Sequence, residues 1–405
     1  MQTLTQPDFK SQRFKANPFP LYARLREEAP VFRFTGAMKE TVWLVTRYDD
    51  VSLVLKHASL SKDVFGGVAA AERRQKMPWL LKLFAPLSQN MLSKDPPDHT
   101  RLRSLVHKAF TPRLIERLRA RVQGLSDRLL DEAARKGSMD LVSEYALIVP
   151  VTIIAEMLGV PSGDYRKFQH WSNRLISNTN LWDVMLSVPS VLMFTRYLRE
   201  LIAQRRSSPG EDLLSALIQA EEAGDRLTPD ELVSMVFLLL VAGHETTVNL
   251  ISGGTLALLQ HPEQLERLRK EPDLIGPAVE ELLRYASPVE ISTERFTRED
   301  LTVAGVTIPR GNLVFASIAS ANRDERHFKD PDMLDLGREP NRHMSFGMGI
   351  HYCLGAPLAR LEGQIALQTL VNRFPNLRLA RPAESLKWRT GVLMRGPKQL
   401  PVSLR

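Results

Sequence analysis

The sequence predicts a mainly helical protein with a small β portion (α+β), folded as a single domain over residues 1–405. Apolar residues recur at helical spacing through most of the chain, as in RLIERLRARVQGLSDRLLDEAARKG (113–137) and VPVTIIAEMLGV (149–160). Stretches rich in β-branched and aromatic residues are few and short. No repeat, low-complexity tract or linker divides the chain, and 405 residues with 43% apolar composition can bury a large core.

The first expected element is a β-hairpin, formed by VFRFTG (31–36) and VWLVT (42–46). A helix is expected in RYDDVSLVLKH (47–57), with acids near its start and lysine near its end. Helices then dominate as far as residue 286. Strands return in LTVAGVTIPRG (301–311), LVFASIAS (313–320) and LRLA (377–380).

The longest expected helix follows Thr228-Pro229-Asp230-Glu231, a capping box with proline at the first helical position. Its apolar pattern runs to Gln260, where His261-Pro262 ends it. At 1.5 Å per residue it is roughly 48 Å long, enough to cross a domain.

The middle of this helix carries AGHETT (242–247), which places small and polar residues in an otherwise apolar segment. One interpretation is a polar patch where the helix reaches the surface. The other is a buried acid and alcohol that handle protons.

The loop FGMGIHYCLG (346–355) surrounds Cys353, the only cysteine, with three glycines. It is no dinucleotide fingerprint, because Tyr352 stands where the third glycine belongs. Two other interpretations remain possible. Cys353 could be a nucleophile with the adjacent His351 as its general base, or a buried cysteine that only fills space. Gly355-Ala356-Pro357 opens a helix, however, and a helix N-terminus stabilises a thiolate. A thiolate ligand to haem iron needs this arrangement.

The formal net charge of +8 comes from basic residues scattered among acids, without a basic run interleaved with aromatics. No nucleic-acid partner is expected, while an acidic protein partner stays open. The N-terminal residues resemble neither a signal peptide nor a membrane anchor, and the longest apolar run, 235–243, is much shorter than the roughly 20 residues of a span. A cytoplasmic protein without disulfides is expected.

Taken together, these residues resemble the haem-thiolate monooxygenases, cytochrome P-450. The cysteine loop matches the family pattern F-G-x-G-x-H-x-C-x-G from Phe346 to Gly355. AGHETT matches the oxygen-activating A-G-x-[DE]-T, and Glu281-Leu-Leu-Arg284 matches E-x-x-R. The order and separations of the three motifs agree along the whole chain.

The resemblance implies the cytochrome P-450 fold, with haem b between the long central helix and the helix after the cysteine loop. It makes Cys353 the proximal iron ligand, Thr246 a hydrogen-bond donor to the dioxygen being activated, and Glu245 the relay of solvent protons. Glu281 and Arg284 become a buried structural pair tied to the segment of Asp335 and Arg338. Further haem contacts are implied at Ala242, Phe346, Gly347 and Gly355, and haem carboxylates would be bound by His99, Arg103, Arg295 and His343 or His351.

With no length left for a flavin domain, electrons are expected from a separate acidic ferredoxin with its reductase, and the protein is expected to be a monomer. Basic residues proposed for docking on the cysteine side are Arg101, His107, Lys108, Arg113 and Arg360.

A sizeable hydrophobic substrate is expected, hydroxylated or epoxidised. The segments look most like bacterial members of the family that hydroxylate polyketides and macrolides in antibiotic biosynthesis; relatives also accept steroids, terpenoids and fatty acyl chains. A haem-based sensor and a cysteine hydrolase are the alternatives from other classes. Pocket residues implied by the family's variable segments are Trp79, Leu80, Phe84, Leu181, Trp182, Met185, Val289, Ile291 and Val392, each of which could equally be core.

Overall fold

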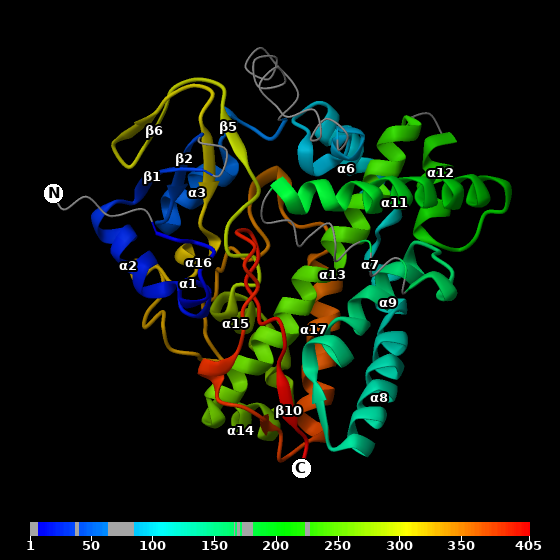
Figure 1. Ribbon diagram of the computed structural model, residues 1–405, viewed down its shortest axis with the longest axis vertical. Coiled ribbons are helices and arrows are strands. Elements are labelled where there is room, and N and C mark those ends of the chain that lie inside the picture. The colour runs from blue at the N-terminus through cyan, green and yellow to red at the C-terminus, as the bar shows by residue number, and fades with distance from the viewer. Residues whose placement is uncertain are drawn as a thin grey trace. The chain divides into compact units, whose positions relative to one another are not determined.

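The computed structural model describes residues 7–36, 40–63, 85–165, 167, 171, 181–222 and 227–405 (Figure 1). Two compact units are present. The first comprises Met1–Leu60, Val122–Val149 and Thr246–Arg405, and the second comprises Ser61–Arg121 and Pro150–Glu245. Interleaved segments of this kind mean that neither unit is a continuous piece of the chain.

The first unit contains the expected hairpin. Strands β1 (Val31–Thr35) and β2 (Thr41–Val45) pair antiparallel, with Val31 opposite Val45. β2 pairs in parallel with β8 (Leu313–Ala316), and the sheet order is β1-β2-β8-β5-β3, with β5 at Arg295–Thr297 and β3 at Leu60–Ser61. One side of this sheet packs on α3 (Tyr48–Lys56) around Val45, Val51 and Val54.

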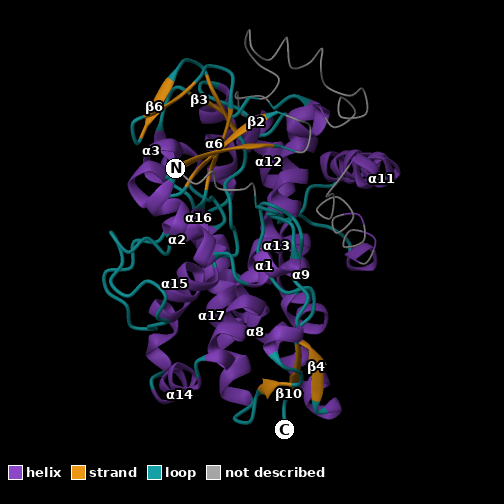
Figure 2. Ribbon diagram, turned by 60° about the vertical axis from the view of Figure 1, so that its left-hand side comes forward, coloured by secondary structure: helices purple, strands orange, loops and turns teal. Residues whose placement is uncertain are grey.

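The other strands of this unit are short. β4 (Ser138–Asp140), β10 (Pro401–Ser403) and β9 (Arg378–Leu379) form one small sheet, and β6 (Leu301–Val303) and β7 (Val306–Ile308) form a ribbon. Figure 2 shows β4 and β10 well apart from β2 and β6. The predicted strand LVFASIAS is right only in its first half, because Ser317 caps a turn of helix, α16 (Ile318–Ala321), by accepting the Ser320 N–H.

Helices build the rest of the first unit. α14 (Pro262–Lys270), α15 (Ile275–Ala286) and α17 (Ala356–Arg373) pack around a second core that includes Leu250, Leu282 and Leu367. The helix predicted over residues 113–137 is not continuous, and its longer part is α8 (Arg119–Lys136). The run breaks at Leu118, whose N–H bonds to Ile115 in a tight turn that closes α7 (Pro112–Arg117).

A buried polar cluster connects the N-terminal helices to later segments. Helices α1 (Gln12–Ala16) and α2 (Phe19–Glu28) supply Lys15 and Tyr22, which both bond to Glu290, at 2.5 and 2.8 Å. Lys15 and Glu290 are no more than 1% exposed, and because they form an ion pair, each compensates the buried charge of the other.

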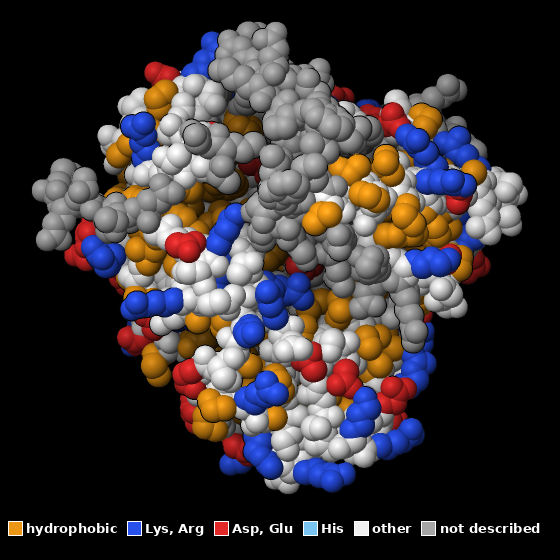
Figure 3. Space-filling view, viewed as in Figure 1, with side chains coloured by type: hydrophobic (Ala, Val, Ile, Leu, Met, Phe, Trp, Pro, Cys, Tyr) orange, Lys and Arg blue, Asp and Glu red, His pale blue; other side chains and the backbone are white. Residues whose placement is uncertain are grey.

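The second unit contains α6 (Asp98–Ala109), α7, α11 (Leu181–Ser207) and α12 (Leu213–Glu222). α12 lies against both α6 and α11. Figure 3 shows hydrophobic side chains grouped over α11, where Leu186, Leu192 and Met193 are more than half exposed.

The long helix α13 (Pro229–Gln260) has the predicted boundaries. Its capping box is present: Thr228 N–H donates to Glu231 at 2.8 Å, and Glu231 N–H donates to the Thr228 hydroxyl at 3.2 Å. Among the described residues, α13 alone is long and apolar enough to cross a membrane, but 61% of its apolar stretch is buried inside the protein. It is therefore packed as a core helix.

Candidate active site: the cysteine loop and the central helix

The loop around Cys353 is a tight, hydrogen-bonded structure. Cys353 N–H donates to the Phe346 carbonyl at 2.9 Å, which closes residues 346–353 into a ring. Gly347 and Gly349 both adopt φ of 70°, a conformation that side-chain-bearing residues rarely take. Gly349 also packs against α3, where an added Cβ would lie 3.1 Å from the Leu55 carbonyl oxygen.

Cys353 itself is exposed, three residues before α17 begins. Gly355 is the N-cap of α17, and a Cβ built on it would lie 3.9 Å from the Cys353 sulfur. The sulfur therefore lies next to the N-terminal turn of an 18-residue helix, whose dipole favours the thiolate. An accessible sulfur beside a helix N-terminus, in a loop with three glycines, fits the thiolate ligand of a haem iron.

An ion cluster holds the loop from the side of α15. Arg360 of α17 donates two hydrogen bonds to Glu280, at 2.7 and 2.8 Å, and its guanidinium lies 4.5 Å from the centre of the Phe346 ring. Burial alone would raise the pKa of Glu280, but the hydrogen bonds from Arg360 and His343 outweigh it and lower that pKa to about 2. The first residue of the cysteine loop is thereby fixed against two helices.

The cluster changes two predictions. His343 Nε2 lies 3.1 Å from a carboxyl oxygen of Glu280, and His343 Nδ1 accepts a hydrogen bond from the Ser345 N–H at 3.2 Å. Both ring nitrogens are therefore engaged within the protein. His343 is therefore not placed to bind a haem carboxylate, which leaves His351 as the predicted residue of the two. Arg360, which was predicted as a docking charge, is paired with Glu280, so that its positive charge is largely compensated.

The E-x-x-R pair is completely buried and doubly bonded. Arg284 donates to Glu281 at 2.7 and 2.8 Å, and both side chains are 0% exposed. Glu281 also accepts from the Asp335 N–H at 3.0 Å and from Arg338 at 3.2 Å. The expected connection from α15 to the segment of Asp335 and Arg338 is therefore present.

The central motif interrupts the mostly buried middle of α13. Glu245 is 6% exposed, whereas Thr246 is half-buried and Ala242 is exposed although it lies in the middle of the helix. His244 is fixed against its own helix by a 2.8 Å contact between Nδ1 and the Leu240 carbonyl. The helix thus presents a small side chain and a hydroxyl on an open stretch, with the acid buried beside them.

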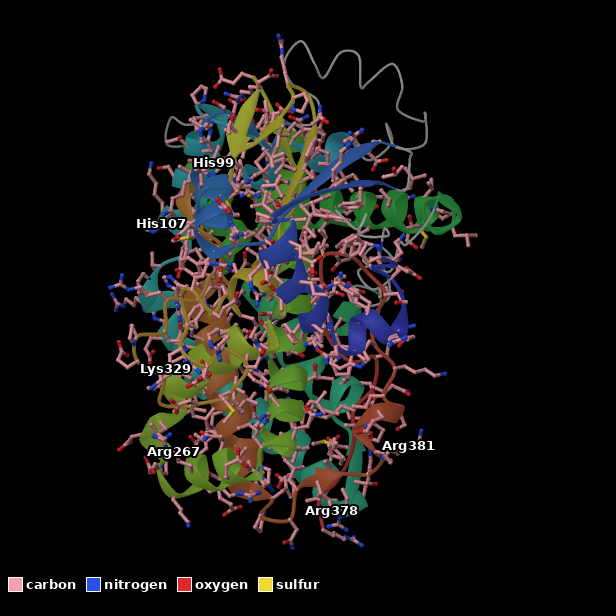
Figure 4. All side chains as sticks on the ribbon, turned by 90° about the vertical axis from the view of Figure 1, so that its left-hand side faces the viewer. His99, His107, Arg267, Lys329, Arg378 and Arg381 are labelled. Carbon is pink, nitrogen blue, oxygen red and sulfur yellow. The ribbon has the colours of Figure 1, made fainter. Side chains whose placement is uncertain are left out.

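The basic residues that were predicted to bind the haem carboxylates belong to both units. Within the second unit, His99 and Arg103 lie one turn apart on α6, His99 buried and Arg103 half-buried; Figure 4 labels His99 and His107 on this helix. Within the first unit, Arg295 is 5% exposed on β5, where it donates to the Thr293 carbonyl at 3.2 Å. His351 closes the short turn Gly349–His351 in the cysteine loop.

The predicted pocket residues divide into two groups. Trp79, Leu80 and Phe84 lie outside the described residues, as do the side chains of Leu181, Trp182 and Met185. Val289, Ile291 and Val392 belong to the first unit, where residues 289–291 run antiparallel to 392–394 and the Glu290 N–H donates to the Leu393 carbonyl at 2.8 Å. Ile291 and Val392 pack in one hydrophobic cluster, and Ile291 is only 3% exposed. Ile291 is therefore a core residue.

Two acids of this region were not predicted from the sequence. Glu280 precedes the E-x-x-R motif, and Glu362 follows the cysteine on α17. The doubled acid in Glu280-Glu281 is the signal for the first, since only one of the two can face Arg284. An acid at an apolar position of the α17 pattern is the signal for the second.

A lone, helix-stabilised thiolate of this kind is the protein ligand of a haem-thiolate protein. The family model for cytochrome P450 matches residues 10–400, and the chain belongs to that family. It is accordingly a monooxygenase that binds haem b through a cysteine thiolate.

Named relatives agree over nearly the whole chain. The polyketide biosynthesis cytochrome P450 PksS of Bacillus subtilis is 46% identical over 395 residues, 96% of each chain, and its solved structure superposes with a TM-score of 0.90 over 98% of this chain and 100% of that one. The cytochrome P450 monooxygenase PikC of Streptomyces venezuelae is 44% identical, covering 97% of this chain and 92% of PikC. Myxobacterial CYP267B1 in complex with myristic acid gives a TM-score of 0.93 at 42% identity, over 98% of this chain and 99% of that one.

Proposed function

We propose that this monooxygenase hydroxylates or epoxidises a polyketide-like or macrolide-like small molecule in secondary metabolism, of the kind made in antibiotic biosynthesis. The observation that carries the proposal is the 46% identity to PksS, named for polyketide biosynthesis, over 96% of both chains. Steroid, terpenoid or fatty acyl substrates are the alternative, and the similar fold of an enzyme solved with myristic acid supports the fatty acyl one.

When bound, haem supplies the activation of dioxygen, with the thiolate donating electron density to the iron. Cys353 would hold the iron, while Ala242, Phe346, Gly347 and Gly355 would lie against the ring. Arg295, His351, His99 and Arg103 would bind its carboxylates through charged hydrogen bonds. Thr246 would orient the dioxygen by a hydrogen bond, and the buried Glu245 would transfer protons to it from solvent.

Electrons would come from an acidic ferredoxin with its reductase, and the enzyme would work as a monomer in the cytoplasm. His107, Lys108 and Arg113 are exposed on α6 and α7 and remain the proposed docking charges. Arg101 is removed from this set because it bonds to Glu231 at 2.5 Å and lies 3.7 Å from Asp98, so its charge is compensated.

The substrate class is tested by titrating the purified haem protein with a macrolactone, a steroid and a long-chain fatty acid while recording the optical shift of the haem. We expect the macrolactone to bind most tightly and to yield a product heavier by one oxygen atom when ferredoxin, reductase and O2 are supplied. Tightest binding and turnover of the fatty acid or the steroid would replace the polyketide proposal by the alternative.

The docking surface is tested by the double variant Lys108→Glu/Arg113→Glu. It should slow reduction by the ferredoxin, increasingly so at low salt, without changing substrate affinity. Lys387→Glu/Lys398→Glu makes the same charge change at exposed positions in the C-terminal segment and is the matched control. Equal reduction rates in the two double variants would show that the donor docks elsewhere.

A further inference from the structure

The short helix α1 is bonded to the C-terminal segment at both of its ends. At its start, the Gln12 side-chain amide donates to the Trp388 carbonyl at 2.9 Å and accepts the Trp388 N–H at 2.8 Å. At its end, the Ala16 carbonyl accepts a hydrogen bond from Arg395 at 3.0 Å, and the Arg395 guanidinium lies 4.3 Å from the centre of the Trp388 ring. All of these residues belong to the first compact unit. The contacts fix α1 against residues 388–395.

A buried ion pair joins the same helix to residues 289–291. The Lys15 ammonium donates to one carboxyl oxygen of Glu290 at 2.5 Å, and Tyr22 of α2 donates to the other at 2.8 Å. None of the three side chains is more than 1% exposed. Removing both charges from water costs about as much as their attraction returns, so the pair adds little stability. It restricts geometry instead, because a buried ammonium must remain beside its carboxylate.

The two segments that α1 joins lie side by side and carry predicted pocket residues. Val289 pairs with Met394 in an antiparallel bridge. Val289 and Val392 are half-buried, so each keeps part of its surface accessible. Val392 also packs against the hydrophobic cluster that contains Phe14 of α1 and Tyr22 of α2. The N-terminal helices therefore support one predicted wall residue of the pocket directly.

We propose that Gln12, Lys15 and Glu290 determine substrate specificity from outside the pocket. By holding α1 against both segments, they set the positions of Val289 and Val392, and with them the room that is left for a substrate. Because protein interiors are close-packed, α1 cannot shift without moving the side chains that rest on it. The three residues act through the two valines, so they are positioning residues. The inference rests on the proposed function, in which a sizeable hydrophobic molecule fills the pocket that these valines are predicted to line.

Two variants remove these contacts without leaving an uncompensated buried charge. Lys15→Met/Glu290→Gln replaces the ion pair by uncharged side chains of similar size. Gln12→Ala removes both hydrogen bonds to the C-terminal segment. Arg24→Met/Glu28→Gln makes the same kind of change in an ion pair of α2 whose members are 55% and 44% exposed, and it is the matched control. An exposed pair of this kind contributes little to stability.

The probes are imidazole and clotrimazole, a small and a bulky azole whose ring nitrogen binds haem iron. The optical shift of the haem in the purified holoprotein gives the affinity for each. Imidazole needs little room, so the ratio of the clotrimazole affinity to the imidazole affinity reports the room in the pocket. The midpoint of thermal unfolding, recorded for every variant, reports stability separately.

We expect both test variants to raise this ratio several-fold, because a wall that α1 no longer holds leaves more room for the bulky azole. The control should keep the wild-type ratio. An unchanged or lowered ratio in the test variants would overturn the inference even if the thermal midpoint falls, because the contacts would then be only structural. A rise of equal size in the control would also overturn it.

The natural substrate is not needed for this measurement, so the inference and the polyketide proposal can fail separately. If the ratio rises but no macrolactone is bound, the positioning role stands and the polyketide proposal fails. If a macrolactone is turned over and the ratio does not change, the polyketide proposal stands and the positioning role fails.

Discussion

Arg360 and Glu280 join the helix of the cysteine ligand to α15 through two hydrogen bonds, at 2.7 and 2.8 Å. The same guanidinium lies over the ring of Phe346, whose carbonyl accepts the Cys353 N–H. A single ion pair thus restrains both ends of the segment that carries the thiolate.

Glu280→Gln should loosen this segment. The pair is about one-third exposed, so we expect a loss of about 1–2 kcal/mol rather than the 3–5 kcal/mol of a fully buried pair. The reduced carbon monoxide complex should lose its thiolate-type spectrum faster on warming. Arg360→Lys keeps the charge without the paired geometry and should behave similarly. Wild-type spectral stability in both variants would show that the pair does not restrain the loop.

The Glu280 carboxylate also makes the stability of the protein depend on pH in acid. The pKa of Glu280 is lowered from 4.5 to about 2, so its contribution is complete above pH 4.5 and is lost as pH falls toward 2. Urea unfolding of wild type and Glu280→Gln across this range checks the sign. The difference in free energy of unfolding should shrink on acidification, and a constant difference would contradict it.

Glu281→Gln should be more damaging than Glu280→Gln. It leaves the Arg284 guanidinium, which is 0% exposed, without its counter-charge, and we expect a loss of about 3–5 kcal/mol or failure to fold with haem. Glu200→Gln, which breaks the exposed pair with Arg196, should cost less than about 0.5 kcal/mol. Similar losses in the two variants, measured by thermal unfolding, would refute the distinction.

Glu362 should make the protein less stable as pH rises. Between pH values of about 4.5 and 8, the Glu362 carboxyl has released its proton in the unfolded protein but keeps it in the folded protein. Over this range the group therefore lowers the free energy of unfolding by about 1.4 kcal/mol for each pH unit of increase. Glu362→Gln removes that slope, and its advantage over wild type should grow up to pH of about 8 and then level off. Parallel stability curves would mean that Glu362 is ionised in the folded protein.

Glu245→Gln and Thr246→Ala should separate proton handling from binding. Product formation should fall by on the order of 10², with electrons diverted to peroxide, while substrate affinity stays near wild type. The comparison requires equal haem content in all samples. Retained product formation in both variants would remove these residues from the proton route.

The sequence was most informative where chemistry restricts the residue type. The glycines with positive φ, the lone Cys353 and the capping box at Thr228 are each visible in the sequence, because few alternatives meet the same physical requirement. The hairpin and the long helix followed from periodicity. The break at Leu118 did not, because the apolar pattern continues through it.

Contacts between distant segments could not be read from the sequence. His343 looked equivalent to His351 as a carboxylate ligand until Glu280, 63 residues earlier, proved to engage it. Ile291 looked like a pocket residue, but it is buried against the N-terminal helices. Arg101 and Arg360 looked like free charges, and each has an acidic partner far away in sequence. Propensity and spacing carry no information about such partners.

The central claim is that Cys353 holds a haem as its thiolate ligand. The most direct measurement is the difference spectrum of the reduced protein with carbon monoxide, recorded for wild type and Cys353→Ser after expression with ample haem. The account predicts the strongly red-shifted Soret band that is characteristic of thiolate ligation in wild type, and its loss in the variant. A wild-type protein without that band, or a variant that keeps it, would contradict the claim.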